Sequence, residues 1–488
     1  MIKVKNLFVV FSLVIVTSVT FAEQEKFSIS GEGKIRFKYV EANVDTIKGS
    51  YGETLKKGLT LRERIDLSVN IPITEYLKVI GTVRISNEDT PVVMMPAPDF
   101  VSTKAIAGWL SLSWEKSPFT VIAGNYDASF TPLTFMRWDL NDNPLGATSC
   151  ACQASVGGIS GESLEELQED YKLEGLKTEL SGELGDFTAL FAIPQFESKN
   201  MSANKYMYGA RARFVPAFIE NLSSASFGVT GLSIKDDTAK VEMSYTKPFQ
   251  SDVFGCDVRI PILWNTSFVG EYARSTRDDD LRDTLNIVHS KNGITGGLQL
   301  LSSDKIDVNL LYLQMDPYFA PLYRSLSCAA NRRGVRFSFT YRDMPLFSKE
   351  VTIAGYYKKL KEIEPTWDDM FIPIPISMPI TYDSKITTFH SSLTDFLVAN
   401  FGITVPIVSN WKIENDYEYR SEYRPDDILT TMDEKINNQT AIVSLILSYE
   451  FTMQSKVLLK YQLIDYMDNL GEKDYIAKIP MLQFSFKF

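Results

Sequence analysis

The sequence has 488 residues, and its 50 Lys and Arg against 61 Asp and Glu give a formal net charge of −11. This acidic balance lacks the basic footprint of nucleic-acid-binding proteins, so we expect no nucleic-acid partner. Only two histidines are present and the four cysteines form no CxxC pair, which argues against most zinc sites. We therefore expect no metal and no cofactor.

The first 22 residues are typical of a secretory signal peptide. Two lysines precede a short apolar core at residues 7–16, and the small residues Thr20 and Ala22 lie at the positions that a signal peptidase requires. The core is short for a helix that crosses a membrane. We predict that residues 1–22 are cleaved and that residues 23–488 form the mature protein.

Alternating apolar and polar residues, the period of a β-strand with one apolar face, begin at residues 27–39 and continue through 59–71 and 77–85. Charge facing lipid is costly, so the polar faces of such strands are expected to line a wet interior. We therefore expect a basic inner wall, formed by Lys34, Arg36, Lys38, Arg62, Arg64, Lys78 and Arg84.

The strand predicted at residues 410–421 carries the opposite charge on its polar face, with Glu414, Asp416 and Glu418. In a closed barrel the first strand pairs with the last, which places this acidic stripe a few strands from the basic wall. Such a separation favours a field across the pore. The alternative is that these charges only pair with their neighbours, and the sequence leaves both open.

Short and long connections alternate along the chain. Short turns are predicted at 72–75, 115–118, 182–186, 301–305, 345–349, 406–410 and 452–454. Long connections are predicted at 41–57, 89–104, 127–170, 236–252, 276–291, 316–332, 361–391 and 422–437. This is the layout of outer-membrane barrels, with long loops outside and short periplasmic turns.

We predict an all-β fold, a single transmembrane antiparallel β-barrel of about 20 strands, with 18 as the alternative because residues 236–252 are ambiguous. A soluble β-solenoid or a set of β-sandwiches is the competing fold. A solenoid would show a fixed repeat, which the sequence lacks. A sandwich would not alternate short and long connections in this way.

The sequence ends on a strand whose apolar face is aromatic. Its aromatic residues, which alternate with polar ones, are Phe484, Phe486 and Phe488. In this feature the chain resembles Gram-negative outer-membrane β-barrels of the porin-like kind. The resemblance implies localisation in the outer membrane, contact with its lipid, and recognition of the three phenylalanines by the barrel-assembly machinery.

The expected function is an outer-membrane channel for passive diffusion of small polar or charged solutes. A barrel for polysaccharide export or uptake is one alternative, and a structural or adhesive surface barrel is another. We expect no enzyme, because the adjacent His390 and Ser391 would point to opposite faces of an extended strand. The oligomeric state and the identity of the solute stay open.

The long connection 127–170 is the candidate constriction or lid of the barrel. Its Ser163 and Glu166 have the spacing of a capping box, which favours a short acidic helix. Clustered carboxylates at 275–283 and 362–369 make calcium a minor expectation, although neither matches an EF-hand.

The even number of cysteines in an exported chain favours disulfides. Cys150 and Cys152 lie in the connection 127–170 and are too close in sequence to bond to each other easily. We expect each of them to reach Cys256 or Cys328 and to fix the long loop at the outer rim.

Overall fold

The structure is a computed structural model of the whole chain, and the ranges that it describes are mostly strands and the turns between them. They are residues 27–44, 47–48, 54–55, 57–87, 104–135, 173–195, 205–218, 224–236, 250–263, 265–278, 281, 288–317, 319, 331–346, 349–363, 393, 395–408, 410–424, 436–452, 454–468 and 474–488. The signal-peptide prediction for residues 1–22 lies outside these residues.

Twenty of the strands form one sheet, and two short strands form a separate hairpin. The barrel strands are β1 (Ser28–Ala42), β4 (Gly58–Pro72), β5 (Leu77–Asn87), β6 (Lys104–Lys116), β7 (Phe119–Tyr126), β8 (Leu173–Gly182), β9 (Gly185–Gln195), β10 (Lys205–Phe214), β11 (Ser226–Asp236), β12 (Gln250–Leu263), β13 (Thr266–Asp278), β14 (Val288–Ser302), β15 (Ile306–Met315), β16 (Arg332–Leu346), β17 (Lys349–Glu362), β18 (Asp395–Val408), β19 (Trp411–Arg424), β20 (Ile436–Thr452), β21 (Ser455–Asp468) and β22 (Tyr475–Lys487). The hairpin strands are β2 (Ile47–Lys48) and β3 (Thr54–Leu55).

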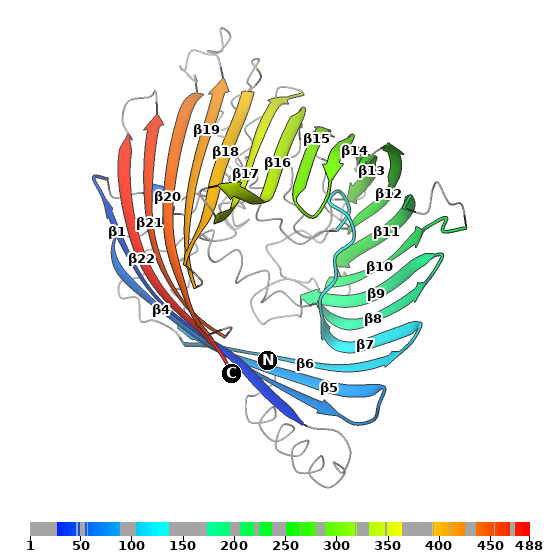
Figure 1. The fold of residues 1–488 in the computed structure, drawn as a ribbon. Coiled ribbons are helices and arrows are strands. Elements are labelled where there is room, and N and C mark those ends of the chain that lie inside the picture. Colours follow the sequence, from blue (N-terminus) through cyan, green and yellow to red (C-terminus); the bar gives the residue numbers. More distant parts are fainter. Residues whose placement is uncertain are drawn as a thin grey trace, which may run out of the picture.

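The sheet closes on itself, because β1 pairs antiparallel with both β4 and β22. Each of the other barrel strands pairs antiparallel with its neighbours in the chain, and Figure 1 shows the resulting ring. The predicted single antiparallel barrel is confirmed, with 20 strands rather than 18. No helix among the described residues is long and apolar enough to cross a membrane.

The strand bounds agree with the predicted alternation of connections. Short connections occur at 73–76, 117–118, 183–184, 303–305, 347–348, 409–410 and 453–454. All of them lie on the rim where β1 begins and β22 ends. The sequence analysis missed two connections on this rim, at 215–225 and 264–265. In the second, Asn265 has a φ of 64°, a left-handed conformation that asparagine tolerates better than most residues.

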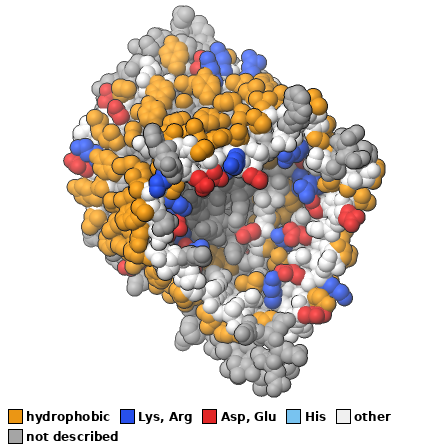
Figure 2. All heavy atoms as spheres, in the orientation of Figure 1, with side chains coloured by type: hydrophobic (Ala, Val, Ile, Leu, Met, Phe, Trp, Pro, Cys, Tyr) orange, Lys and Arg blue, Asp and Glu red, His pale blue; other side chains and the backbone are white. Residues whose placement is uncertain are grey.

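The outer surface of the barrel is apolar, and charged side chains surround its hollow (Figure 2). β22 shows the alternation clearly. Phe484 and Phe486 are 39% and 38% exposed on the outer surface, whereas Gln483, which precedes them, accepts a hydrogen bond from Arg36 on β1 in the interior. A closed antiparallel barrel with an apolar exterior and a polar interior is the architecture of porin-like outer-membrane barrels.

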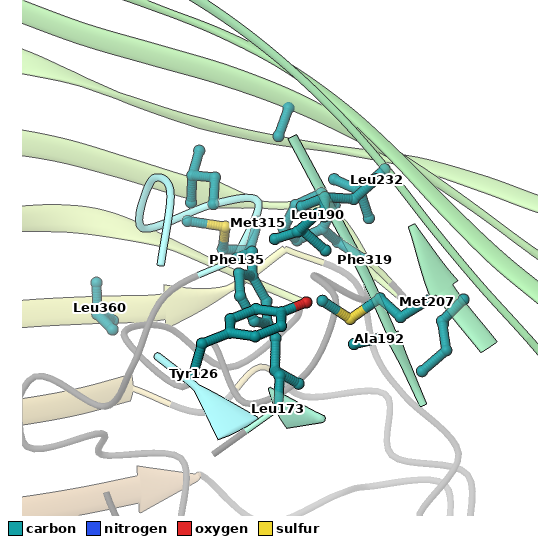
Figure 3. Packing of buried hydrophobic residues seen from close by; sticks show 14 of the residues in the cluster. Tyr126, Phe135, Leu173, Leu190, Ala192, Met207, Leu232, Met315, Phe319 and Leu360 are labelled. Atoms are coloured by element: carbon teal, nitrogen blue, oxygen red, sulfur yellow. The ribbon is translucent and has the colours of Figure 1, made fainter. Parts of the chain in front are cut away.

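Two apolar clusters interrupt the polar interior near the rim of the long connections. The larger one gathers residues from β7 to β18, including Leu190, Met207 and Met315 (Figure 3). The smaller one lies beside the closure of the barrel and includes Val40 and Ile464.

Candidate functional site

Three buried arginines form the core of the inner wall where the barrel closes. Arg36 on β1, Arg64 on β4 and Arg84 on β5 are only 5–7% exposed. Asp66 lies opposite Arg84 in the strand register and accepts hydrogen bonds from Arg64 Nε at 2.9 Å and Arg84 Nε at 2.6 Å. One carboxylate therefore binds two guanidinium groups, and among the buried residues that the structure describes on β1, β4 and β5 three arginines accompany one aspartate.

The remaining basic residues predicted for this wall surround the arginines. Arg36 donates from Nε to Oε1 of the neutral Gln483 at 2.9 Å. Lys34 pairs with Glu32 at 3.4 Å, and Lys38 is half-buried on the same face of β1. The wall thus extends along β1 from Lys34 to Lys38.

Two of the predicted basic residues differ from the rest of the wall. Lys78 lies near the rim of the short connections and pairs with Glu115 at 2.7 Å, so its charge is balanced locally. Arg62 lies opposite Arg36 in the register of β4 and β1, but its side chain is outside the described residues.

The acidic residues predicted on β19 lie four strands from β1 around the closure, and they are partly neutralised. Glu418 accepts a hydrogen bond from the Tyr356 hydroxyl at 2.9 Å and forms an ion pair with Arg420. Asp416 accepts a hydrogen bond from Asn400 Nδ2 at 2.8 Å. Glu414 is half-buried on the same face of the strand.

A second basic group, which the sequence analysis missed, lies on β16 and β17. Arg332 is 4% exposed, and its guanidinium carbon lies 3.7 Å from the centre of the Phe396 ring. Lys358 is 2% exposed and lies opposite Arg336 in the register. The alternation of Arg332, Gly334 and Arg336 in the sequence is the signal that could have identified this wall.

Basic residues therefore outnumber acidic ones in the buried part of the described chain, by six to four. The basic residues are Arg36, Arg64, Arg84, Arg332, Lys358 and Arg420, and the acidic ones are Asp66, Asp236, Glu271 and Glu418. This excess is opposite in sign to the net charge of the whole chain.

The first part of the connection 127–170 runs inside the barrel along the inner wall of β9–β13 (Figure 1). Leu133 and Phe135 belong to the larger apolar cluster, and the Leu133 amide donates to Oε1 of Glu271 on β13 at 2.8 Å. Gly255 on β12 leaves room for Thr134, because a Cβ atom at Gly255 would overlap the Thr134 methyl group. Residues 136–172, with the predicted helix, lie outside the described residues.

Cys256 does not form the disulfide that we expected. It is a free, exposed thiol on β12, on the same face as the exposed Phe254, and so it points out of the barrel. The prediction assumed that Cys256 lies at the start of the strand, whereas the strand begins six residues earlier, at Gln250. The other three cysteines, Cys150, Cys152 and Cys328, lie outside the described residues.

The three C-terminal phenylalanines lie on the outer surface beside β1. Phe484, Phe486 and Phe488 are exposed, and the rings of the last two stack at 6.3 Å. The Phe488 amide donates to the Gly31 carbonyl at 3.0 Å, so this residue is paired with the first strand. Their recognition by the assembly machinery stays a prediction.

Among the described residues, no group of three or more histidine, cysteine or acidic side chains is arranged to hold a metal ion. The acidic stretches 275–283 and 362–369 extend beyond the described residues. Calcium binding there stays a prediction.

No family model and no curated protein matches this sequence. Solved structures that resemble it include OccAB3 of Acinetobacter baumannii, at 8% identity and a TM-score of 0.41, over 94% of this chain and 100% of that one. OpdK of Pseudomonas aeruginosa, solved with vanillate, matches at 8% identity and 0.41, over 94% and 99%. OmpT of Vibrio cholerae matches at 9% identity and 0.34, over 96% and 99%. The functional argument below therefore rests on the barrel itself.

Proposed function

We propose that this protein is an outer-membrane channel, exported through a cleaved signal peptide, for passive diffusion of small polar or charged solutes. The closed barrel supports a path through the membrane, and the charged side chains around its hollow support a wet lumen (Figure 2). The segment 127–135 packs in the larger apolar cluster, which gathers residues from β7 to β18. The basic wall of β1, β4 and β5 lies on strands outside that cluster.

The buried basic wall carries the proposal that the channel prefers anions. Arg64 and Arg84 share the buried carboxylate of Asp66 there, with Arg36 buried on the neighbouring strand, and Arg332 and Lys358 add positive charge on a second part of the wall. Charge beside a narrow path with low-dielectric walls acts on a solute more strongly than distant surface charge, which salt screens within about 10 Å. The acidic whole chain therefore does not decide the ion preference.

Reversal potentials in planar bilayers under a salt gradient test this preference. Arg36→Gln is the sharpest variant, because Arg36 is only 7% exposed and its Nε donates to the neutral Gln483. A unit charge about 8 Å from a hydrated ion contributes roughly 0.5 kcal/mol in water, with opposite signs for an anion and a cation, so the anion-to-cation permeability ratio should fall about sixfold. Arg332→Gln should act in the same direction.

The matched control is Arg213→Gln, because Arg213 pairs with Asp186 beside the short-connection rim and its side chain is 48% exposed. This variant should leave the reversal potential close to that of the wild type. Unchanged potentials for both Arg36→Gln and Arg332→Gln would remove the basic wall from the selectivity mechanism. A pore that shows no steady conductance would instead favour the structural or polymer-handling alternatives.

A further inference from the structure

Three basic side chains gather on the outward face of β16 and β17, next to the rim of the long connections. Arg333 lies directly opposite Lys361 in the register of the two strands, and Lys359 lies two residues from Lys361 on the same face. All three are exposed, whereas Arg332 and Lys358 beside them in the sequence are buried. This outer basic patch, formed by Arg333, Lys359 and Lys361, is therefore separate from the basic residues of the inner wall.

The outer basic patch has little acid to balance its charge. Lys361 forms an ion pair with Asp395 on β18, which is long at 3.8 Å and exposed on both sides. Within the part of the chain that the structure describes, the side chains of Arg333 and Lys359 form no ion pair or hydrogen bond. Like charges directly opposite each other on a sheet are destabilising, so Arg333 and Lys361 repel each other. A bound anion would relieve this repulsion.

Acidic residues occupy outward positions near the same rim on other strands. Glu41 near the end of β1, Glu174 near the start of β8 and Asp465 on β21 share a face with exposed apolar residues of their strands. The cluster of positive charge is thus a local feature of β16 and β17 rather than a property of the whole rim.

An apolar surface continues from the outer basic patch towards the middle of the barrel wall. Val335 lies opposite Lys359, and the next pair on the same face is Phe337 and Tyr357. These three side chains are exposed. Apolar and aromatic side chains on the outward face of a membrane barrel contact acyl chains. A ligand with an anionic head and acyl chains therefore matches both parts of this surface.

A tyrosine on the neighbouring strand indicates the depth of the outer basic patch in the membrane. Tyr312 on β15 is exposed, and its hydroxyl donates to Gln314 at 3.0 Å. Gln314 in turn lies opposite Arg333 in the register of β15 and β16. Tyrosines whose rings face lipid and whose hydroxyls face polar groups mark the interface of a membrane barrel. The outer basic patch is thus at the depth of the lipid headgroups.

We propose that the outer basic patch binds lipopolysaccharide through a phosphate group of its lipid A part. The outer-membrane location proposed above, with the long connections outside, is required for this binding, whereas the channel activity is not. Lipid A carries phosphate groups on a sugar backbone above its acyl chains. The Arg333 guanidinium donates two parallel hydrogen bonds to one phosphate, and the ammonium groups of Lys359 and Lys361 donate to the same group. Acyl chains cover Phe337 and Tyr357.

Native mass spectrometry of the purified protein, titrated with single lipids, tests the proposal. Lipid A that carries its phosphates should bind. Lipid A from which the phosphates have been removed has the same acyl chains and should bind at least tenfold more weakly, the factor that one charge-assisted hydrogen bond contributes. Phosphatidylglycerol should also bind at least tenfold more weakly, because its phosphodiester has fewer free oxygen atoms and less negative charge than a phosphomonoester.

Variants of the outer basic patch locate the site. Arg333→Gln and Lys359→Gln should each weaken the binding of phosphorylated lipid A about tenfold, and the double variant should weaken it further. The matched control is Lys349→Gln, because Lys349 is exposed at the opposite end of β17, beside the short connections, and lipid A binding should stay at the wild-type level. Equal binding of lipid A with and without phosphate, or wild-type binding by the double variant, would overturn the proposal.

Unfolding by guanidinium in detergent micelles gives a second readout. Without lipid A, Arg333→Gln should unfold at a higher guanidinium concentration than the wild type, because the repulsion from Lys361 is relieved. Added lipid A should raise the midpoint of the wild type and leave that of the double variant unchanged. A variant less stable than the wild type without lipid would contradict the repulsion on which the proposal depends. Conductance should stay at the wild-type level in these variants, so a failure of lipid binding and a failure of channel activity are distinguishable.

Discussion

The closure of the barrel depends on two phenylalanine rings that lie over two glycines. Phe486 lies opposite Gly33 in the register of β22 and β1, and the Phe488 backbone exchanges two hydrogen bonds with Gly31, of 2.8 and 3.0 Å. A Cβ atom on Gly33 would overlap the Phe486 ring, and one on Gly31 would overlap the Phe488 ring. The absence of a side chain on β1 is thus matched by an aromatic ring on β22, an arrangement that stabilises glycine in sheets.

The double-mutant cycle of Gly33→Ala and Phe486→Ala measures this packing. Gly33→Ala alone forces the ring aside and should lower the free energy of unfolding by about 1–3 kcal/mol, the usual cost of overpacking. Phe486→Ala should lower the free energy of unfolding by about 1 kcal/mol more than the loss of buried apolar area alone would, because the ring no longer packs on its aromatic neighbour. With the ring gone, the added methyl group has space, so the double variant should be more stable than the sum of the two changes predicts by about 1–3 kcal/mol.

Guanidinium unfolding in detergent micelles, followed through the fluorescence of the six tryptophans, gives these free energies. Gly296→Ala is the control, because a Cβ atom there has ordinary space, and the stability should change by less than about 0.5 kcal/mol. Strictly additive effects of Gly33→Ala and Phe486→Ala would refute the ring-over-glycine account of the closure.

Three other predictions address the rims and the internal segment. Protease added to intact cells should cut only within 127–170, 316–332 and 361–391, and cuts at the short connections would invert the topology. Cys256 should react with a thiol reagent in the denatured, unreduced protein, and an unreactive Cys256 would show that it is bonded after all. Glu271→Ala removes the acceptor of the Leu133 amide and should raise the single-channel conductance by releasing the segment, whereas an unchanged conductance would show that the segment does not narrow the pore.

Local periodicity predicted the barrel well because a strand that faces lipid and water must alternate along its own length. It therefore identified the polar face of β1 and the acidic face of β19 from short stretches of sequence. The same pattern was available for Arg332 and Arg336, since only Gly334 lies between them on that face of the strand. It failed for Cys256, because one misplaced strand start changes which residues lie near a rim.

The contacts that shape the interior could not be predicted in this way. Glu271 binds the amide of Leu133 across 138 positions of the sequence, and no local pattern relates the two residues. The role of Gly255 depends equally on a residue far away in the sequence, because it is Thr134 that occupies the space which a side chain at Gly255 would fill. Periodicity can thus indicate that a long connection exists, while its path through the barrel follows from pairings between distant strands.

The two apolar clusters strengthen the case for the basic wall as the selective element. Val40 belongs to the smaller cluster and lies two residues beyond Lys38 on the same face of β1, towards the rim of the long connections. The larger cluster, with Leu133, covers the other side of the interior at that end of the barrel. Apolar walls lower the local dielectric constant and extend the reach of nearby charges. In the proposed channel, the positive charge of Arg36 would therefore act on a solute that has just left an apolar mouth, where screening by water is weakest.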